Sequence, residues 1–451
     1  MARPRVLLVY PSSFRSEGWG GAVLPTKTHM VALYTAVSKA AECDVLDLEV
    51  EIGRPADIRE EAAFALEVRQ MLGERTFDVL AVSCWTSLSY RATKCVLEAA
   101  AIVRPAALTI VGGYHATARP DDFEGLADIV VTGEGESALV DAVKSMPKRG
   151  TSTRVVAGRP SPMEYAPELD WEGYPYLVRG WPVGVYLSRG CPFSCSFCME
   201  GVKGDHRALP VDEALRLVAR TVEVVEPSQL RFSDACFGAS PSWRRDFLRG
   251  LVDLGAGTEY WAETRADLID EADAALMAKL DLRLDIGLDA ASPEMLEIMA
   301  KCADPATYLD TYAAADAALD ENGVPHATYL LFNHPGETRQ TVAETLSYME
   351  RLVDGKDATA GWIAAQSYAF FPGSLVDREL TRFERRFGTR VLNPRWWTMQ
   401  GPLLELASRV IPSRHLTLSG KNFWKAGMRR LQRKLEGIMS DEARNAVGVK
   451  V

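Results

Sequence analysis

Short apolar runs alternate with amphipathic stretches along the first third of the chain. Five runs rich in Val, Ile and Leu each end near a glycine, a serine or a turn, and they lie at 5–10, 45–50, 77–83, 108–113 and 128–133. Helical spacing of apolar positions marks stretches between them, for example 58–72 and 92–103. Near-continuous apolar strands that alternate with helices are typical of a parallel sheet covered on both faces. Residues 1–150 are therefore predicted to form a doubly wound α/β domain.

A second series of apolar runs begins at Val183, after a stretch rich in Pro, Gly and aromatic residues at 151–182 that is predicted to be a linker. The candidate strands of this series lie at 183–188, 230–233, 259–263, 282–288, 326–332 and 362–368, with helical runs between them. A complete eightfold βα barrel takes about 250 residues. Residues 183–375 hold only six βα units, so we expect an open, partial barrel.

The last part of the chain, 376–451, is predicted to be a basic, helical cap. Apolar residues recur there at helical spacing opposite basic ones: Trp424, Met428, Leu431, Leu435 and Met439 against Arg429, Arg430, Arg433 and Lys434. Such a helix is amphipathic. It either packs on the barrel with its basic face in solvent, or docks an anionic substrate group, a carrier protein or a membrane surface. The segment Arg-Trp-Trp at 395–397 is expected to line a substrate pocket or to belong to the core.

Charge and composition narrow the class of protein. The chain of 451 residues has 51 Lys and Arg against 61 Asp and Glu, and this net charge of -10 leaves no overall basic footprint for nucleic acid. No apolar run reaches the roughly 20 residues that a membrane-spanning helix needs. The N-terminal residues lack the apolar segment and cleavage site of a signal peptide. We therefore expect a cytoplasmic protein without a membrane span and without a nucleic-acid partner.

Three of the eight cysteines crowd into one short segment. Cys191, Cys195 and Cys198 have the spacing C-x3-C-x2-C within SRGCPFSCSFCMEG (188–201), directly after the first strand of the second series. Three thiolates on one loop can hold three irons of a [4Fe–4S] cube and leave the fourth iron open, whereas ferredoxin-type clusters use four cysteines. A structural zinc site needs a fourth ligand, for which His206 is the only nearby candidate. A chance grouping of cysteines is the other alternative.

The cysteine segment resembles the cluster loop of radical S-adenosylmethionine (SAM) enzymes. Five later segments resemble the strand ends of that family's barrel, in the same order: FSDACFG (232–238), WAETRADLI (261–269), IGLDAASPEMLEIMAK (286–301), LLFNHPGET (330–338) and YAFFPGS (368–374). The resemblance implies a partial (β/α)6 barrel of the TIM type. It also implies that the open iron chelates the amino and carboxylate groups of SAM, which a low-potential electron cleaves to methionine and a 5′-deoxyadenosyl radical.

The same resemblance implies residues that bind SAM. The backbone around Phe197 would contact the adenine, and Asp234 and Arg265 stand where polar contacts to the methionine end are expected. Asp289 stands where related enzymes often carry a glutamate for the ribose, and its side chain is one methylene shorter. Ordinary hydrogen bonding or ion pairing at the strand ends is the alternative role for these three charged residues.

Glycines at the strand ends of the first domain suggest a second cofactor, because missing side chains let a large planar ligand approach the backbone. With the sheet topology, they resemble the flavodoxin-like cobalamin-binding domain found ahead of many radical SAM barrels. The resemblance implies that cobalamin contacts the strand-end residues Ser12, Ser83, Thr86, Gly112, Gly113, Tyr114, His115, Gly133, Glu134, Gly135 and Glu136. A domain of this fold that binds nothing is the alternative.

One departure concerns the cobalt ligand. Cobalamin mutases carry Asp-x-His-x-x-Gly after the first strand, but the corresponding loop at 11–21 has no histidine, and His29 stands without the Asp and Gly partners. This absence implies that cobalt is bound without a protein histidine on its lower face. His115 is expected either to contact the corrin or to have a structural role.

Two cofactor domains face to face imply a cobalamin-dependent radical SAM methyltransferase of the class B type, with a [4Fe–4S] cluster, SAM and cobalamin as cofactors. One SAM would methylate Co(I) by polar transfer. A second would give the radical that removes a substrate hydrogen, and the carbon radical would take the methyl group from methylcobalamin. We expect a small-molecule substrate, a role in secondary metabolism and an external electron donor of the flavodoxin or ferredoxin type.

The choice of reaction stays open at this point, and no catalytic residue is assigned. An enzyme with the same cofactors that catalyses a cyclisation or another rearrangement without methylation is one alternative. A cobalamin-binding sensor or partner protein, in which the cluster loop is a structural remnant, is the other.

Overall fold

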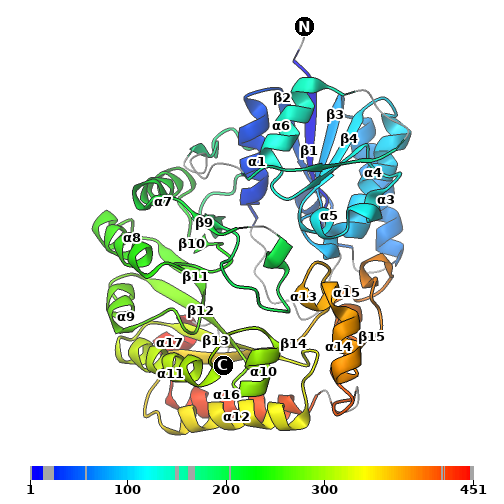
Figure 1. The fold of residues 1–451 in the computed structure, drawn as a ribbon. Coiled ribbons are helices and arrows are strands. Elements are labelled where there is room, and N and C mark those ends of the chain that lie inside the picture. Colours follow the sequence, from blue (N-terminus) through cyan, green and yellow to red (C-terminus); the bar gives the residue numbers. More distant parts are fainter. Residues whose placement is uncertain are drawn as a thin grey trace.

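The computed structural model describes residues 3–13, 25–55, 58–147, 152–160, 168–202, 205–417, 420 and 422–446. Two six-stranded sheets dominate it, one in each of two domains. The N-terminal domain lies at the top of Figure 1, and the second domain with the C-terminal region lies below it. The carboxyl ends of the strands in the first sheet lie toward the second domain, which brings the two halves of the chain together at one site.

Six parallel strands form the first sheet in the order β2-β1-β3-β4-β5-β6. They are β1 (Arg5–Tyr10), β2 (Glu42–Asp47), β3 (Val79–Ser83), β4 (Leu108–Gly112), β5 (Ile129–Thr132) and β6 (Arg154–Ala157). All residues of β3 are buried, as expected for a strand covered on both faces. The strand order reverses between β1 and β3, which is where doubly wound sheets bind ligands. The predicted flavodoxin-like topology is confirmed.

The helices of the first domain cover the sheet in two pairs. They are α1 (Thr28–Ser38), α3 (Ile58–Gly73), α4 (Tyr90–Val103) and α6 (Glu136–Ser145). Helix α1 packs against α6 and α3 packs against α4. The short helix α5 (Tyr114–Ala118) starts directly after β4, so its first turn lies at the ligand-binding edge of the sheet.

Two details of this domain differ from the sequence-based prediction. The strand expected at 45–50 ends at Asp47, because its carboxylate accepts hydrogen bonds from the N–H groups of Glu49 (3.0 Å) and Val50 (3.2 Å) and starts helix α2 (Leu48–Glu51). Strand β6 lies inside the stretch predicted as a linker. Its four residues are exposed and pair along one edge with β5, so the burial pattern that marked the other strands is missing.

The second sheet is a partial barrel with strand order β14-β13-β12-β11-β10-β7, all parallel. Its strands are β7 (Val183–Val185), β10 (Gln229–Phe232), β11 (Glu259–Arg265), β12 (Leu282–Asp289), β13 (His326–Phe332) and β14 (Gly361–Ser367). Its outer helices include α7 (Val211–Val225), α8 (Pro241–Leu254), α9 (Glu271–Met277), α11 (Pro305–Glu321) and α12 (Arg339–Asp354). The predicted open (β/α)6 architecture is confirmed.

The first predicted strand of this series, 183–188, is split. Strand β7 ends at Val185, and β8 (Ser188–Arg189) leaves the sheet to pair in antiparallel fashion with β9 (Arg207–Ala208). The resulting two-stranded ribbon holds the base of the cysteine segment.

The C-terminal helix α16 (Trp424–Ile438) packs on α12 and β14. Its apolar face is buried, and the ring of Trp424 stacks on Phe332 with centroids 4.9 Å apart. Part of its basic face is paired with α12, since Arg430 binds Glu350 and Lys434 lies 2.5 Å from Asp354. Of the two interpretations of this helix, the cap fits the structure.

The tryptophans at 396 and 397 are also core residues. Both are fully buried, and their indole N–H groups donate to the carbonyl of Phe370 (2.6 Å) and to the carboxylate of Asp122 (2.7 Å). They join the C-terminal region to both domains instead of lining a pocket.

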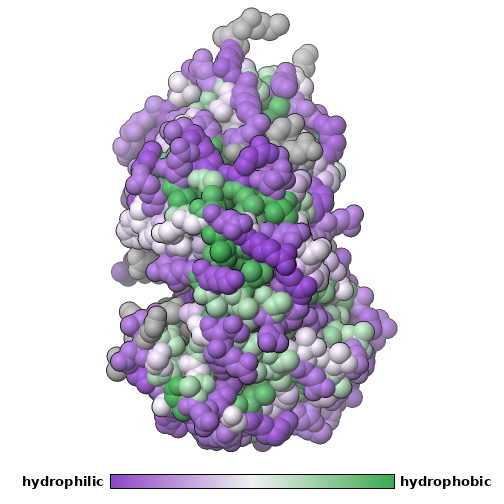
Figure 2. Space-filling model, turned by 90° about the vertical axis from the view of Figure 1, so that its left-hand side faces the viewer, coloured by the Kyte–Doolittle hydropathy of each residue, from purple (hydrophilic) through white to green (hydrophobic). Residues whose placement is uncertain are grey.

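The molecular surface shows where apolar side chains gather. Figure 2 shows green, apolar residues at mid-height, between the two domains, with hydrophilic residues above and below them.

A search of the described helices finds none that is both long and apolar enough to cross a membrane.

Candidate functional site

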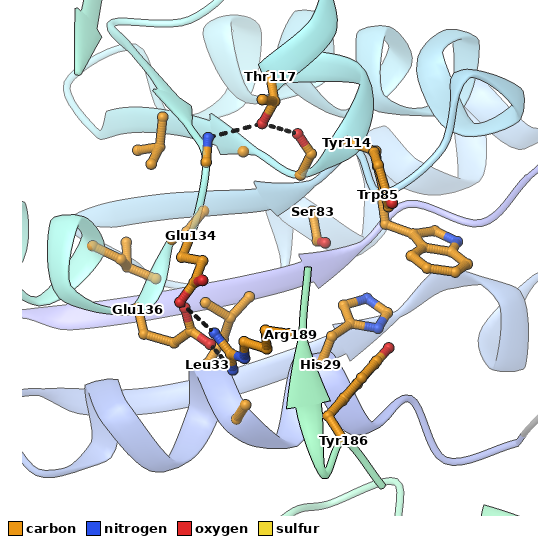
Figure 3. A pocket seen from close by; sticks show the side chains of 18 of the residues that line it. His29, Leu33, Ser83, Trp85, Tyr114, Thr117, Glu134, Glu136, Tyr186 and Arg189 are labelled. Carbon is orange, nitrogen blue, oxygen red and sulfur yellow. Dashed lines mark hydrogen bonds and ion pairs between the residues drawn. The ribbon is translucent and has the colours of Figure 1, made fainter. Parts of the chain in front are cut away.

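A cavity of about 1300 Å³, counting the space at its open mouth, lies between the two domains. Its walls come from strands β1, β3, β4 and β5, from helices α1, α5 and α6, and from Tyr186 and residues 188–190 of the second domain. Figure 3 shows the strand ends of the first domain around it, with His29, Trp85 and Tyr186 on one side.

Glycine allows two strand-end loops to meet in the cavity wall. Gly113 has a φ of 105° and a ψ of -174°, and a Cβ added there would lie 2.7 Å from the carbonyl group of Cys84. A side chain fits neither that backbone conformation nor that space. The hydroxyl of Thr117 then joins this loop to the next one, because it donates to the Gly113 carbonyl (2.9 Å) and accepts from the Gly133 N–H (2.9 Å; Figure 3).

An arginine links this wall to the cysteine segment. Arg189 binds the carboxylates of Glu134 at 2.9 Å and Glu136 at 2.5 Å, as the dashed lines of Figure 3 show. Arg207, on the partner strand of the ribbon, also binds Glu134. Arg189 precedes Cys191 by two positions in the chain. Its charge-assisted contacts therefore fasten the loop after β5 to the start of the cysteine segment.

Most residues predicted to bind cobalamin line the cavity. Eight of the eleven do so: Ser83, Gly112, Gly113, Tyr114, Gly133, Glu134, Gly135 and Glu136. The other three do not line it, and each has a hydrogen bond elsewhere in the protein. The hydroxyl of Ser12 donates to the Gly53 carbonyl (2.8 Å), and that of Thr86 accepts a hydrogen bond from the Leu88 N–H (3.4 Å).

His115 is the third. Its Nδ1 lies 2.8 Å from the hydroxyl of Ser87 and its Nε2 lies 3.3 Å from the carboxylate of Asp122. Burial lowers the pKa of His115, so the neutral ring is favoured. These contacts give His115 the structural role that the sequence left as one of two possibilities.

Sequence reasoning missed an aromatic side of the cavity. The ring of His29 stacks on Trp85, with centroids 5.5 Å apart and planes 16° apart, and Tyr186 also lines the cavity. One signal was available, since Trp85 lies between the predicted residues Ser83 and Thr86 at the end of β3. His29 lies in the first turn of α1, at the same edge of the sheet.

The three cysteines lie on the loop between β8 and the short helix η4 (Met199–Val202), and each is half-buried. Between them, Ser196 is fully buried and anchors the loop to the barrel. Its N–H donates to the carbonyl of Met299 (2.8 Å), and its hydroxyl lies 2.9 Å from Nε2 of His334. Burial lowers the pKa of His334 to about 3, so its ring stays neutral. His334 was assigned no role from the sequence.

The donor set on this loop fits an iron–sulfur cluster. In the part of the chain that the structure describes, no three His, Cys, Asp or Glu side chains gather closely enough to bind one metal ion. The cysteines of a [4Fe–4S] cube each bind a different iron, so their thiolates do not need to converge on one point. His206, the candidate fourth ligand of a zinc site, instead lines a small pocket with Asp234 and Trp243. Three thiols on one loop are the donors that three irons of such a cube need.

Arg265 connects the end of β11 to the cysteine loop. Its guanidinium carbon lies 3.7 Å from the centre of the Phe193 ring, and one terminal nitrogen lies 3.6 Å from Sγ of Cys195. The carboxylate of Asp267 accepts from its other N–H groups at 2.9 and 3.0 Å. The arrangement holds a positive charge beside the proposed cluster, at the place predicted for SAM.

Of the other residues predicted to bind SAM, Phe197 lies on the cysteine loop, and Asp234 and Asp289 lie at strand ends of the barrel. Asp289, at the end of β12, has a φ of 65° and lies 2.5 Å from Nζ of the buried Lys301, a partner that the sequence did not suggest. Asp234 accepts from both the N–H and the hydroxyl of Ser188, and burial raises its pKa to about 7. Phe197 packs edge-on against a histidine ring, 6.1 Å away. Their contacts to SAM stay predictions.

The chain matches two family models. Residues 185–349 match the Radical SAM superfamily model, and residues 25–143 match the B12 binding domain model. The cysteine loop falls inside the first match and the glycine-lined wall inside the second. The cofactors of this protein are therefore a [4Fe–4S] cluster, SAM and cobalamin.

Curated proteins with similar sequences include several methyltransferases. An uncharacterized methyltransferase of Pyrococcus horikoshii is 24% identical over 61% of this chain and 64% of its own length. An anaerobic magnesium-protoporphyrin IX monomethyl ester cyclase of Rubrivivax gelatinosus is 25% identical over 62% of this chain and 55% of its own. A 2-(S-pantetheinyl)-carbapenam-3-carboxylate methyltransferase of Streptantibioticus cattleyicolor is 31% identical, over 40% of this chain and 30% of its own. The chain thus spans less than two thirds of each of these relatives.

Solved structures share the two-domain fold. The radical SAM methyltransferase TsrM of Kitasatospora setae, with cobalamin and a [4Fe–4S] cluster bound, aligns over 86% of this chain and 77% of its own, with a TM-score of 0.66 and 17% identity. The cobalamin-dependent SAM radical enzyme OxsB, with aqua-cobalamin and SAM bound, aligns over 94% of this chain and 66% of its own, with a TM-score of 0.63 and 14% identity. At this identity the likeness shows the fold.

Proposed function

We propose that this enzyme, which joins a B12-binding domain to a radical SAM domain, is a cobalamin-dependent methyltransferase that acts on a carbon atom of a small molecule. One observation carries the proposal: a single cavity has walls from both domains, and its wall of glycines is tied by Arg189 to the loop that bears the cysteines. Two cofactors that act on one carbon atom must lie on opposite sides of a shared space. The methyltransferases among the curated relatives support the same reaction class.

When bound, the cluster supplies the electron that cleaves SAM to a deoxyadenosyl radical, and cobalamin carries a methyl group from a second SAM to the substrate. The residues of this chain bind and orient these groups. Cys191, Cys195 and Cys198 would each hold one iron. Arg265 places a permanent positive charge beside Cys195, which favours the anionic cluster and the carboxylate of SAM.

The first domain supplies the complementary surface. Gly112 and Gly113 leave the backbone of the cavity wall open to a flat ligand, and Tyr114 binds Glu200 of the cysteine segment across the cavity. Arg189, paired with two glutamates, holds the two domains in register around the ligand. We further propose that the electron comes from an external donor of the flavodoxin or ferredoxin type.

The test is an anaerobic product assay. The protein is purified with cobalamin, its cluster is reconstituted, and SAM and a reductant are added, after which S-adenosylhomocysteine and 5′-deoxyadenosine are measured by mass spectrometry. We expect both products, with deoxyadenosine lost in Cys191→Ala and kept in Cys95→Ala, whose thiol lies in α4 outside the loop. Neither product, from protein with verified cluster and cobalamin contents, would contradict the proposal.

A second candidate is a cyclisation or another rearrangement that uses the same cofactors without methylation. The similarity to the cyclase of Rubrivivax gelatinosus favours this reading. The same assay separates the two candidates, because deoxyadenosine without S-adenosylhomocysteine indicates a reaction that transfers no methyl group.

A further inference from the structure

The inner face of the partial barrel is polar. Along β11, Glu259, Trp261, Glu263 and Arg265 alternate with buried residues. Alternate residues of a strand share one face, so Glu263 lies on the same inner face as Arg265, which reaches the cysteine loop. TIM barrels usually fill this space with branched apolar side chains. A polar inner face is therefore a feature that packing alone does not explain.

Glu263 has no protein partner within the described structure. Its side chain is accessible to solvent, although many protein atoms lie around it. Among the described residues, no hydrogen bond or ion pair holds its carboxylate. Burial, together with the negative charges of Asp285 and Glu200, raises the pKa of Glu263 to about 7. The carboxylate of Glu200, one of the two that raise this pKa, lines the cavity between the domains.

A positive charge without an ion pair lies on the neighbouring strand. Arg231 of β10 is in register with Trp261, and its guanidinium carbon lies 5.1 Å from the centre of that ring. Its Nε donates to the side chain of Gln229 (2.8 Å), and no carboxylate of the described chain lies within ion-pair distance of it. Arg231 and Glu263 are near enough to influence each other's pKa, but no ion pair between them forms in the described structure.

Two charges of the next strand on this face compensate each other. Arg283 and Asp285, on β12, form an ion pair with a distance of 3.3 Å. Within the described structure, the inner face thus keeps one guanidinium without an ion pair, that of Arg231, and two such carboxylates. These are Glu259 at the amino end of β11 and Glu263, which is the one coupled to Arg231.

We propose that this face binds the charged end of the substrate as a zwitterion, with an ammonium group at Glu263 and a carboxylate at Arg231. The substrate would then be an amino acid or a molecule with a free amino acid end. The inference rests on the proposed methyltransferase function and names its substrate class. Charge-assisted hydrogen bonds to both groups would fix the charged end in the barrel, while the rest of the molecule extends past Arg265 toward the cluster and the cavity.

The test measures binding and needs no turnover. Cluster- and cobalamin-loaded protein with SAM, and without reductant, is dialysed against a mixture of the proteinogenic L-amino acids, and the retained amino acids are identified by mass spectrometry. We expect at least one to be retained, and its affinity to fall about tenfold or more in Glu263→Gln and in Arg231→Gln. Glu259→Gln, which changes an exposed carboxylate at the other end of the same strand, serves as the matched control and should bind like the unchanged protein.

Ligand variants repeat the test on the unchanged protein, so the result does not depend on the folding of a variant. The N-acetyl form and the methyl ester of the retained amino acid each lack one charge, and both should bind about tenfold more weakly or worse. Retention of no amino acid, or equal binding of the charged and blocked forms, would overturn the proposal. Failure of the methyltransferase proposal is recognised separately, by the lack of S-adenosylhomocysteine and deoxyadenosine in the product assay.

Discussion

Replacement of Gly113 by alanine should destabilise the cavity wall. The φ and ψ of this residue (105° and -174°) lie in a region that is essentially reserved for glycine, where another residue costs about 1–3 kcal/mol. The new methyl group would lie 2.7 Å from the carbonyl group of Cys84 and 3.0 Å from Cα of Trp85. These are backbone atoms that cannot rotate away, so overpacking adds about 1–3 kcal/mol. We expect a total loss of about 2–6 kcal/mol in the free energy of unfolding.

Gly125→Ala is the matched control in the same domain. Gly125 also has a positive φ, of 73°, but a Cβ added there meets no atom within 4 Å. Its replacement should cost only the conformational penalty of about 1–2 kcal/mol. The difference between the two variants therefore reports the close approach of the two loops at the cavity, together with the more restricted backbone region of Gly113.

Urea denaturation, followed by far-UV circular dichroism, compares the two variants with the unchanged protein. A lower midpoint at equal slope reports a change of stability. The Gly113→Ala variant should also retain less cobalamin on gel filtration, because the loops that it displaces form the wall of the cavity. Equal stability of the two variants would refute the argument, since it would mean that the loops relax without cost.

Two further predictions concern charged groups. Arg189→Gln removes one of the links between the domains and should lower the free energy of unfolding by about 2 kcal/mol. In the same urea titration, Arg179→Gln, which alters an exposed ion pair, should change it by less than about 1 kcal/mol. His326 is buried with Nε2 3.1 Å from the carboxylate of Asp316 and Nδ1 2.9 Å from the carbonyl of Val324, which raises its pKa. Because the folded-state pKa is the higher of the two, protonation of His326 stabilises the fold. This stabilisation is complete below the unfolded-state pKa of about 6.5 and is lost as the pH rises through the folded-state pKa. Urea titrations across this range should show the stability gap between the unchanged protein and His326→Gln shrinking as the pH rises, and a gap that widens would contradict the assignment.

The fold class could be predicted from the chain because each half repeats a local pattern. Apolar runs of strand length that alternate with helical spacing indicate parallel sheets, and the structure has two parallel sheets, one in each domain. The prediction was weaker where one side chain decides the local structure. Asp47 ends β2 by capping the next helix, and exposed β6 carries no burial pattern to reveal it.

The sequence also located the parts of the site that depend on short spacing. The cysteine segment and the glycine-rich loops are each continuous in the chain, and eight of the residues predicted for cobalamin line one cavity. Ser12 and His115 fell outside it, because the direction of a side chain at a strand end depends on contacts with residues far away in the sequence. Thr86 fell outside it because its hydroxyl caps the N–H of Leu88, two residues further along. For His115 these contacts include Asp122, which in turn binds Trp397.

The sequence alone determined which chemistry is present: three thiolates on one loop and glycines at the ends of parallel strands. Only the tertiary structure decided how these parts meet. Arg189 binds glutamates more than fifty positions away, and Glu263 and Arg231 lie on one inner face without an ion-pair partner in the described structure. Spacing along the chain cannot show such pairs, because their energies depend on distances in space and on solvent access that arise when the strands come into register.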